Sequence, residues 1–333
     1  MPELRKDPVT SRWVIIAGQR ANRSTDFPIY KMEFKPQKNK CPFCKGNESD
    51  TPPEIIAYRE EGSEPNSDQW WIRVIPNKFA ALDMKEDLSK SWIGVFDLMN
   101  GVGSHEVVIE TPEHDLSIPD FSNNQVEKIL WAYHDRVTHL AKDTRIKYIL
   151  VFKNFGAMAG ATIAHSHSQI IGMPIIPKLV NEELQGFANY FEYKERCIYC
   201  DIIKQELVSG TRVILENDHF VTISPFASRS PYEMWILPKR HEPDFTNSSK
   251  EEITDLADIL KKTLTKLKIA LDNPAYNYII HTIPTHHVLS DYHWHIEIMP
   301  RISTIAGFEW GSGFFINHVV PEDASKKLRE IKV

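Results

Sequence analysis

The sequence has little that would commit it to a membrane, to nucleic acid or to secretion. It lacks any apolar run near 18 residues and has a mean hydropathy of −0.35, which argues against a membrane span. It has 39 Lys and Arg against 45 Asp and Glu, and the basic residues form no cluster. We therefore do not expect electrostatic binding to nucleic acid or anionic lipid. The first ten residues lack the apolar stretch of a secretory signal. We therefore expect a cytoplasmic protein whose 333 residues fill two domains, or one large one.

Cysteine is scarce, but its placement is informative. All four cysteines fall into two C-x-x-C pairs, Cys41-Pro-Phe-Cys44 and Cys197-Ile-Tyr-Cys200. This spacing places both thiols of a pair on one tight turn, where they provide half of a tetrahedral zinc site. The redox use of C-x-x-C needs a thioredoxin-like βαβ context, which neither pair has. Metal binding is the favoured interpretation.

An internal repeat supplies the remaining metal ligands. After each pair come a strand-like run ending in a histidine, an amphipathic segment, and a strand-like run entering a His-x-His motif. The histidine that ends the first run and the first histidine of the His-x-His motif are 51 positions apart in the first copy (His114 and His165) and 52 in the second (His241 and His293). The repeat predicts two four-ligand sets, namely Cys41, Cys44, His114 and His165, and Cys197, Cys200, His241 and His293.

The amphipathic segments predict one helix in each copy. Apolar residues recur at helical spacing from Val126 to Leu140 and from Ile253 to Leu267, and Ser249-Lys-Glu-Glu252 fits a capping box. Strands, helix and strand in each half predict an α+β fold, with helices packed on a mainly antiparallel sheet. We expect a catalytic half with a zinc site at residues 1–178 and a second half with its own metal site at residues 179–333.

The first His-x-His motif has the features of a nucleophile. On a strand, His165, His167 and Gln169 share one face. The preceding run, 154–162, is rich in small residues that let backbone N–H groups approach a phosphate, whereas the second copy has no glycine there. With His165 taken by metal, His167 is free to attack phosphorus as a neutral imidazole, and Gln169 can donate to the phosphoryl oxygens.

These motifs resemble the HIT superfamily, in which a His-x-His strand faces the α-phosphate of a nucleotide. Gln169 stands where the hydrolase branch has a third histidine, so the chain is similar to the nucleotidyltransferase branch, the galactose-1-phosphate uridylyltransferase family. Ordered matches cover nearly the whole chain: Arg12-Trp-Val-Ile, Arg20-Ala-Asn-Arg23, Cys41-Pro-Phe-Cys44, Val74-Ile-Pro-Asn77-Lys-Phe79, Pro112-Glu-His114, residues 154–169 and Gly307-Phe-Glu309.

The resemblance implies roles for individual residues of a duplicated HIT-like fold. It implies zinc at the first ligand set and a covalent nucleotidyl intermediate on His167. It also implies a homodimer in which the C-terminal segment reaches the partner's active site. Base and ribose contacts are implied for Arg20, Arg23, Asn77 and Phe79, phosphate contacts for Asn154, Gly156, Thr162 and Gln169, and sugar contacts for Phe308 and Glu309.

The second half departs from the best-known uridylyltransferases. Those relatives build their second metal site from a Glu and three histidines, to which Glu183, His281, His293 and His295 correspond here. The second cysteine pair instead resembles the ADP-glucose phosphorylase branch, with zinc or iron as the metal. Unless they form that Glu and three-histidine site, we expect Glu183 to be solvated and His281 to be an ordinary histidine. We also expect His105 to be an ordinary histidine. Lys78 also replaces an acidic residue of the nucleotide segment.

The expected activity is a ping-pong nucleotidyl transfer. UDP-glucose gives its uridylyl group to His167, and a hexose 1-phosphate, galactose 1-phosphate, then takes it. The alternative within the family uses ADP-glucose as donor and phosphate as acceptor. Two further classes stay open: a HIT-type nucleotide hydrolase, which would favour a third histidine at position 169, and a non-catalytic zinc-binding module, which would favour basic and aromatic patches.

Overall fold

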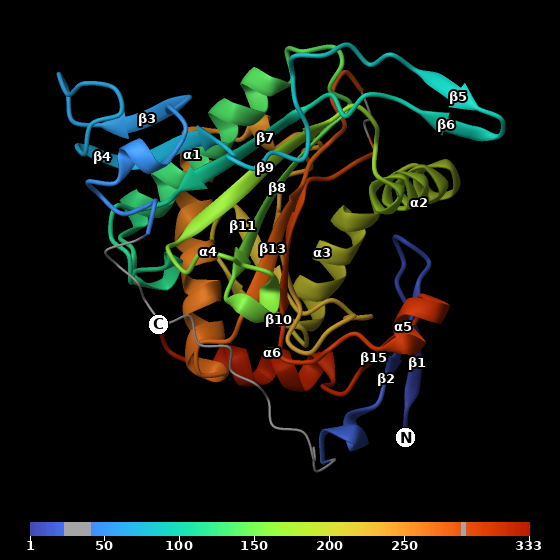
Figure 1. Cartoon of the computed structure of the whole chain (residues 1–333). Helices are drawn as coiled ribbons and strands as arrows, with labels where there is room; N and C mark the ends of the chain where they lie inside the picture. The colour runs from blue at the N-terminus through green and yellow to red at the C-terminus, as the bar shows by residue number, and fades with distance from the viewer. Residues whose placement is uncertain (23–40, 288–290) are drawn as a thin grey trace.

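The computed structural model describes residues 1–22, 41–287 and 291–333. Ten strands form one large sheet in which every neighbouring pair is antiparallel (Figure 1). These strands are β3 (Ile56–Arg59), β4 (Trp70–Pro76), β7 (Ser104–Ile109), β8 (Tyr148–Phe155), β9 (His167–Met173), β10 (Val213–Glu216), β11 (Phe220–Ile223), β12 (Met234–Pro238), β13 (Tyr276–His281) and β14 (His295–Pro300).

The strand order shows the duplication directly. Across the sheet it is β10-β11-β12-β14-β13-β8-β9-β7-β4-β3. From each outer edge inward, the first three strands of a half follow chain order, and then its fifth strand precedes its fourth. The two halves meet where β8 pairs with β13. The expected α+β fold with a duplicated, mainly antiparallel unit is confirmed.

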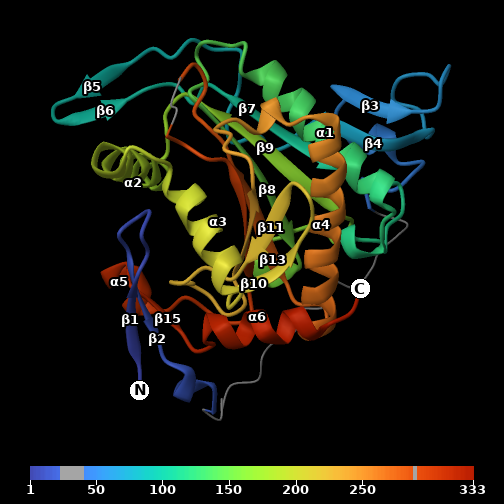
Figure 2. The same ribbon diagram turned by 180° about the vertical axis from the view of Figure 1, so that it is seen from behind.

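Two long helices cover one face of the sheet. They are α1 (Asn123–Leu140) and α4 (Lys250–Ala270), which lie side by side (Figure 2). Their apolar stripes bury residues such as Ile129 and Leu260 in a core that also contains Val151 and Ile280 from the two central strands. The capping box of Ser249 and Glu252 begins α4. Both helices expected from periodicity are confirmed, and one core spans both halves.

The opposite face is only partly covered. The helices α2 (Lys178–Lys194) and α3 (Ile198–Ser209) pack on β11 and β12 through apolar residues that include Phe187 and Trp235. A three-stranded sheet lies beside them together with a short helix, and a small hairpin projects from the first half (Figure 1). The last helix packs instead against α4 and β10. These elements are β1 (Glu3–Lys6), β2 (Trp13–Ile16), β15 (Phe315–Asn317), α5 (Gly307–Ser312), α6 (Pro321–Glu330), β5 (Ser91–Ile93) and β6 (Phe96–Leu98). Among the described residues, no helix is long and apolar enough to cross a membrane.

The middle of this second face is open. Most side chains along β8 and β9 alternate between buried positions that face the helices and half-exposed positions that face away from them, as expected for a sheet covered on one side. Tyr148 and His167 are buried on this second face. Phe152 and Gln169, which are paired across the two strands, are both half-exposed. This open central strip carries His167 and its surroundings.

Candidate active site and metal centres

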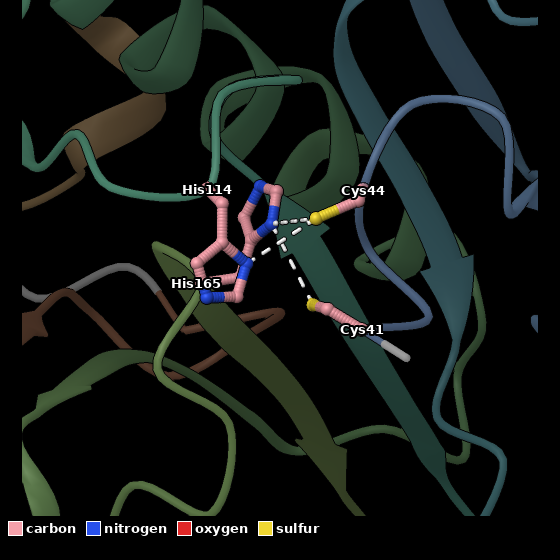
Figure 3. Close-up of side chains that lie close together, drawn as sticks. All are labelled: Cys41, Cys44, His114 and His165. Atoms are coloured by element: carbon pink, nitrogen blue, oxygen red, sulfur yellow. Dashed lines mark hydrogen bonds between the residues drawn. The ribbon is translucent and has the colours of Figure 1, made fainter. Parts of the chain in front are cut away.

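The first cysteine pair and its two histidines converge as predicted. Their ligand atoms all lie within 4.8 Å of one another. The Cys44 Sγ is 3.2 Å from His114 Nδ1 and 3.5 Å from His165 Nδ1, and the Cys41 Sγ is 3.7 Å from the same His165 nitrogen (Figure 3). Residues from a loop before β3, a loop after β7 and the approach to β9 thus meet at one point.

The donor set fits a tetrahedral zinc ion. Zinc bonds of about 2.3 Å to sulfur and about 2.05 Å to nitrogen set a tetrahedral sulfur-to-nitrogen edge of about 3.6 Å, close to the separations found here. The His165 Nε2–H donates to the Thr111 carbonyl at 2.7 Å, which leaves the Nδ1 lone pair facing the thiols. Burial lowers the pKa of His165 to about 4, so its ring is neutral and able to ligate.

The second cysteine pair repeats this geometry. The Cys200 Sγ lies 3.5 Å from His241 Nδ1 and 3.7 Å from His293 Nδ1, and the Cys197 Sγ is 3.7 Å from His293 Nδ1. The His293 Nε2–H donates to the Pro238 carbonyl at 2.9 Å, as His165 does to Thr111. Here the pair sits at the start of α3 rather than in a loop. Both sets can hold a metal, and their chemistry is compatible with zinc.

A third cluster corrects the expectation for Glu183. Its side chain is buried, not solvated, with one carboxylate oxygen 3.2 Å from His281 Nδ1 and the other 3.2 Å from His295 Nε2. Burial alone would raise the pKa of Glu183, but the two imidazoles outweigh it and hold the pKa at about 2. The ligand atoms of these three residues also lie within 4.8 Å of one another. The second His-x-His motif is therefore divided, with His293 at the thiols and His295 at Glu183.

His167 is fixed through one of its two ring nitrogens. Its Nδ1–H donates to the His165 carbonyl at 2.8 Å, so the lone pair of Nε2 remains available. Burial lowers the pKa of His167, which keeps the imidazole neutral and nucleophilic near pH 7. The edge of the Phe43 ring packs on it, with ring centroids 5.3 Å apart. The carbonyl that orients the His167 ring belongs to a predicted metal ligand, so the first ligand set and His167 share one stretch of backbone.

The orientation of Gln169 follows from a hydrogen-bond chain that begins at the backbone. The Ala81 N–H donates to His105 Nδ1 at 3.1 Å, so the proton of His105 is on Nε2. That Nε2–H donates to Gln169 Oε1 at 2.7 Å. Asn77 Nδ2 lies 3.1 Å from the same His105 nitrogen and 3.4 Å from Gln169 Oε1, to which it donates. With its oxygen engaged, Gln169 presents its NH₂ group as the donor for an anion.

His105 is the site residue that sequence reasoning missed. It is not an ordinary histidine, because it is the close partner of Gln169. Alternation along β7 puts it on the same face as Val107, which pairs with Gln169, but only the strand register reveals that neighbour.

Replacing His105 with alanine should slow nucleotidyl transfer by about 10- to 100-fold, because the Gln169 amide loses the donor that fixes its orientation. We expect the free energy of unfolding to change little and His105→Gln, which keeps an N–H donor, to recover part of the rate. Single-turnover kinetics and urea unfolding measure the two effects. His139→Ala, an exposed histidine of α1, is the matched control. Equal rates in His105→Ala and wild type would show that Gln169 needs no such partner.

A buried ion pair supports the nucleophile from the other side of the strand. Lys153 Nζ donates to Glu110 Oε2 at 2.5 Å and to the His167 carbonyl at 3.0 Å. Burial would raise the pKa of Glu110, but Lys153 and the hydroxyls of Ser166 and Ser168 hold it below its usual range. The backbone at His167 is thus tied to a fully buried charge network.

Lys153→Met should destabilise the fold by about 3–5 kcal/mol, because it leaves the buried Glu110 carboxylate without its counter-charge. The double variant Lys153→Met/Glu110→Leu should recover much of that loss, since both charges are then gone. Urea unfolding of the single and double variants checks this. A single variant as stable as wild type would contradict the interpretation.

The structure gathers some of the predicted substrate residues and separates others. Asn77 reaches Gln169, and Asn154 and Gly156 stand at the end of β8 beside the open strip. Thr162 and Phe79 are exposed, as is Arg20 after β2. Within the described part of the chain no hydrogen bond or ion pair joins α5 to His167, and Arg23 lies outside the described residues. The sugar contacts expected from Phe308 and Glu309 stay a prediction.

Comparisons with known proteins show which family this chain resembles. The family model described as galactose-1-phosphate uridyl transferase, N-terminal domain, matches residues 1–177, and a domain of unknown function matches residues 115–331. The chain is 40% identical to ADP-glucose phosphorylase of Arabidopsis thaliana, covering 100% of this chain and 93% of that protein. It is 30% identical to galactose-1-phosphate uridylyltransferase of Thermotoga maritima, covering 100% of this chain and 99% of that protein.

Solved structures are similar to this chain in the same family. A crystal structure of the Arabidopsis thaliana ADP-glucose phosphorylase with bound ADP-glucose superposes with a TM-score of 0.86 at 40% identity, over 100% of both chains. A uridylyltransferase structure superposes with a TM-score of 0.77 at 27% identity, over 99% of this chain and 97% of the other. The protein therefore belongs to the galactose-1-phosphate uridylyltransferase family and is a nucleotidyltransferase.

Proposed function

We propose that the protein transfers the adenylyl group of ADP-glucose to phosphate by way of His167, releasing glucose 1-phosphate and then ADP. The observation that carries the covalent mechanism is the neutral, buried imidazole of His167, whose Nδ1 is engaged by the His165 carbonyl. The choice of adenylyl donor is supported by 40% identity, along the whole chain, to an ADP-glucose phosphorylase.

In the first half-reaction the Nε2 lone pair of His167 attacks the α-phosphorus. A nitrogen–phosphorus bond forms, the bond from that phosphorus to the bridging oxygen breaks, and glucose 1-phosphate leaves with the electron pair. The ring becomes cationic while its Nδ1–H stays on the His165 carbonyl, which stabilises that charge. The NH₂ group of Gln169 donates to the phosphoryl oxygens as charge develops on them.

In the second half-reaction phosphate takes the place of glucose 1-phosphate. One of its oxygens attacks the same phosphorus, the nitrogen–phosphorus bond breaks, and ADP leaves with neutral His167 restored. The same donors act in both directions, because the two half-reactions pass through transition states of the same kind.

We propose zinc for both Cys₂His₂ sets. Cys41, Cys44, His114 and His165 would hold one ion, and Cys197, Cys200, His241 and His293 the other. A closed four-ligand site of this kind supplies folding stability rather than an open coordination position for substrate. Every chemical step above is assigned to residues of the chain.

The second candidate is the uridylyl reaction, with UDP-glucose as donor and galactose 1-phosphate as acceptor. It is favoured by 30% identity to a galactose-1-phosphate uridylyltransferase over the whole chain. Both candidates share His167 and differ in the nucleotide and the acceptor.

Intact-mass analysis separates the two. The protein is mixed with ADP-glucose or with UDP-glucose, without acceptor, and weighed. We expect an AMP adduct with ADP-glucose that disappears when phosphate is added. A UMP adduct alone would establish the uridylyl reaction instead, and turnover without any adduct would indicate a hydrolase.

We further propose a homodimer in which α5 serves the partner's site. This helix presents Phe308 and Trp310 to solvent at 47% and 78% exposure, and it lies beside β15 rather than on β9, the strand that begins at His167 (Figure 1). Sedimentation of the full chain, and of a Trp310→Asp variant, measures the oligomeric state.

A further inference from the structure

A cavity of about 690 Å³ lies on the open face of the sheet, next to the small-residue run 154–162. Its lining includes Phe152 of β8 and Ile171 of β9, the strand that begins at His167. One wall includes Asn154, and the other includes Asn277 and Arg301 from the second half of the chain. Among the described residues no acidic side chain lines the cavity, and the guanidinium of Arg301 is the one full charge in that lining.

The strand register sets one lining residue of this cavity, Asn154, opposite His167, which does not itself line the cavity. Asn277 of β13 pairs with Asn154 of β8. β8 and β9 pair at Phe152 and Gln169, and continuing that antiparallel register by two residues sets Asn154 opposite His167. The three side chains therefore lie in one row across neighbouring strands, about 5 Å apart along the sheet.

Arg301 differs from every other buried or half-buried arginine in the described part of the chain. Each of the others has a carboxylate oxygen within 4.0 Å: Arg5, Arg12, Arg59, Arg73, Arg136, Arg145, Arg212 and Arg229. Arg301 is half-buried with no such partner, and its one side-chain hydrogen bond runs from Nε to Asn277 Oδ1 at 2.5 Å. A cation removed from water without a counter-charge costs free energy, which an anionic ligand would recover.

Asn277 orients the donors on both walls. Its oxygen accepts from Arg301, and its Nδ2 donates to Asn154 Oδ1 at 2.7 Å and to the Ala159 carbonyl at 2.9 Å. The oxygen of Asn154 is thereby engaged, and its Nδ2 has no partner among the described residues, so it remains a donor. Both Nη groups of Arg301 are likewise unused in the described structure.

The approach of the two walls is fixed by backbone packing. Gly156 has φ +82, and a Cβ there would lie 2.8 Å from the Cβ of Ala275, in the turn before β13. The backbone N–H of Arg301 donates to the Ala275 carbonyl at 2.7 Å. The same turn thus contacts the run that holds Asn154 and the segment that holds Arg301.

We propose that Arg301, with Asn154 and the bridging Asn277, forms the binding site for the phosphate that departs from and attacks the nucleotidyl phosphorus. This inference rests on the proposed function and specifies which residues of the protein bind the acceptor phosphate. In a ping-pong reaction the acceptor phosphate occupies the position vacated by the phosphate of the leaving sugar phosphate. One guanidinium placed there recognises both.

The test is the discharge of preformed adenylyl-enzyme by inorganic phosphate. Full-length wild type and Arg301→Met are loaded with ADP-glucose, desalted, and mixed with increasing phosphate. We expect Arg301→Met to need on the order of 10- to 100-fold more phosphate for half-maximal discharge, the usual effect of losing a charge-assisted hydrogen bond. Arg301→Lys should fall between the two. Loading should be slower at low ADP-glucose but reach the same final adduct.

Two controls separate anion binding from structural damage. Arg145→Met removes a half-buried arginine that pairs with Asp143 away from the cavity, and it should discharge like wild type. AMP binding, measured by calorimetry in a His167→Ala background, should be the same with and without Arg301→Met. If Arg301→Met does not fold, Asn277→Ala should give a smaller shift in the same direction. Unchanged phosphate dependence in a folded Arg301→Met, or equal weakening of AMP, overturns the proposal.

A different result would identify failure of the proposed function itself. If wild type forms no nucleotidyl adduct, inorganic phosphate is titrated directly into wild type and Arg301→Met by calorimetry. Phosphate binding that depends on Arg301 would support the anion site without the adenylyl reaction. Absence of that dependence would overturn the site as well.

Discussion

Replacing His167 with alanine should lower nucleotidyl transfer by roughly 10⁴-fold or more, the scale seen when the nucleophile of a covalent mechanism is removed. No other side chain among the described residues combines a free imidazole Nε2, burial and a place beside Asn154 on the open strip. The AMP adduct should be absent in intact-mass analysis of the variant mixed with ADP-glucose. Its thermal unfolding should stay close to that of wild type, because His167 is not a predicted metal ligand.

His295→Ala is the matched comparison for His167→Ala. It removes the equivalent histidine of the second copy, whose Nδ1 likewise faces the carbonyl of the preceding metal-set histidine, His293, at 3.1 Å. That variant should form the adduct, because His295 contacts Glu183 rather than the open strip. Release of glucose 1-phosphate by His167→Ala in a single turnover, at the wild-type amount, would contradict the covalent mechanism.

Removing the first metal set should cost both stability and activity. Structural zinc contributes roughly 10–16 kcal/mol of apparent binding free energy in small zinc-dependent peptides, and most of that is folding free energy. Cys44 contacts both histidines of the set, so Cys44→Ser should lose one metal equivalent per chain and lower the unfolding temperature sharply. His165 would then no longer fix the carbonyl that orients His167, and adduct formation should fall with it.

Cys200→Ser tests whether the two metal sets differ in role. It should lose the other metal equivalent and also lower the unfolding temperature, while the folded fraction still forms the adduct, since Cys200 belongs to the second half. Elemental analysis, calorimetric unfolding and intact mass together measure these effects. Purified protein without metal, or a Cys44→Ser variant with wild-type stability, would contradict the assignment.

The sequence was most informative where function depends on residue type and spacing. The 51- and 52-residue spacings of the histidines, together with two C-x-x-C pairs, predicted two ligand sets that the structure brings within 4.8 Å. Helical periodicity predicted α1 and α4, because a helix on one side of a sheet must present an apolar stripe. The order of strands and helix within each copy was enough to predict the duplicated α+β unit.

The sequence failed where a residue's role depends on its partner across the fold. Glu183 was expected in solvent, yet α2 carries it to His281 and His295, about 100 residues later in the chain. His105 was expected to be ordinary, yet the pairing of β7 with β9 sets it against Gln169. In both cases the missing information is strand register and helix placement, which local periodicity does not encode.

The sequence by itself therefore determined which residue types are available for the proposed chemistry. These are the thiol and imidazole ligands of the two metal sets, His167, which belongs to neither set, and Gln169 in place of a third histidine, all within a duplicated unit. Only the tertiary structure decided which groups act together. It paired β8 with β13 and so brought Asn277 and Arg301 of the second half to the small-residue run 154–162 of the first. The physical reason is that residue type and spacing follow from the chain alone, whereas the partner of a buried charge is set by packing between segments that are distant in sequence.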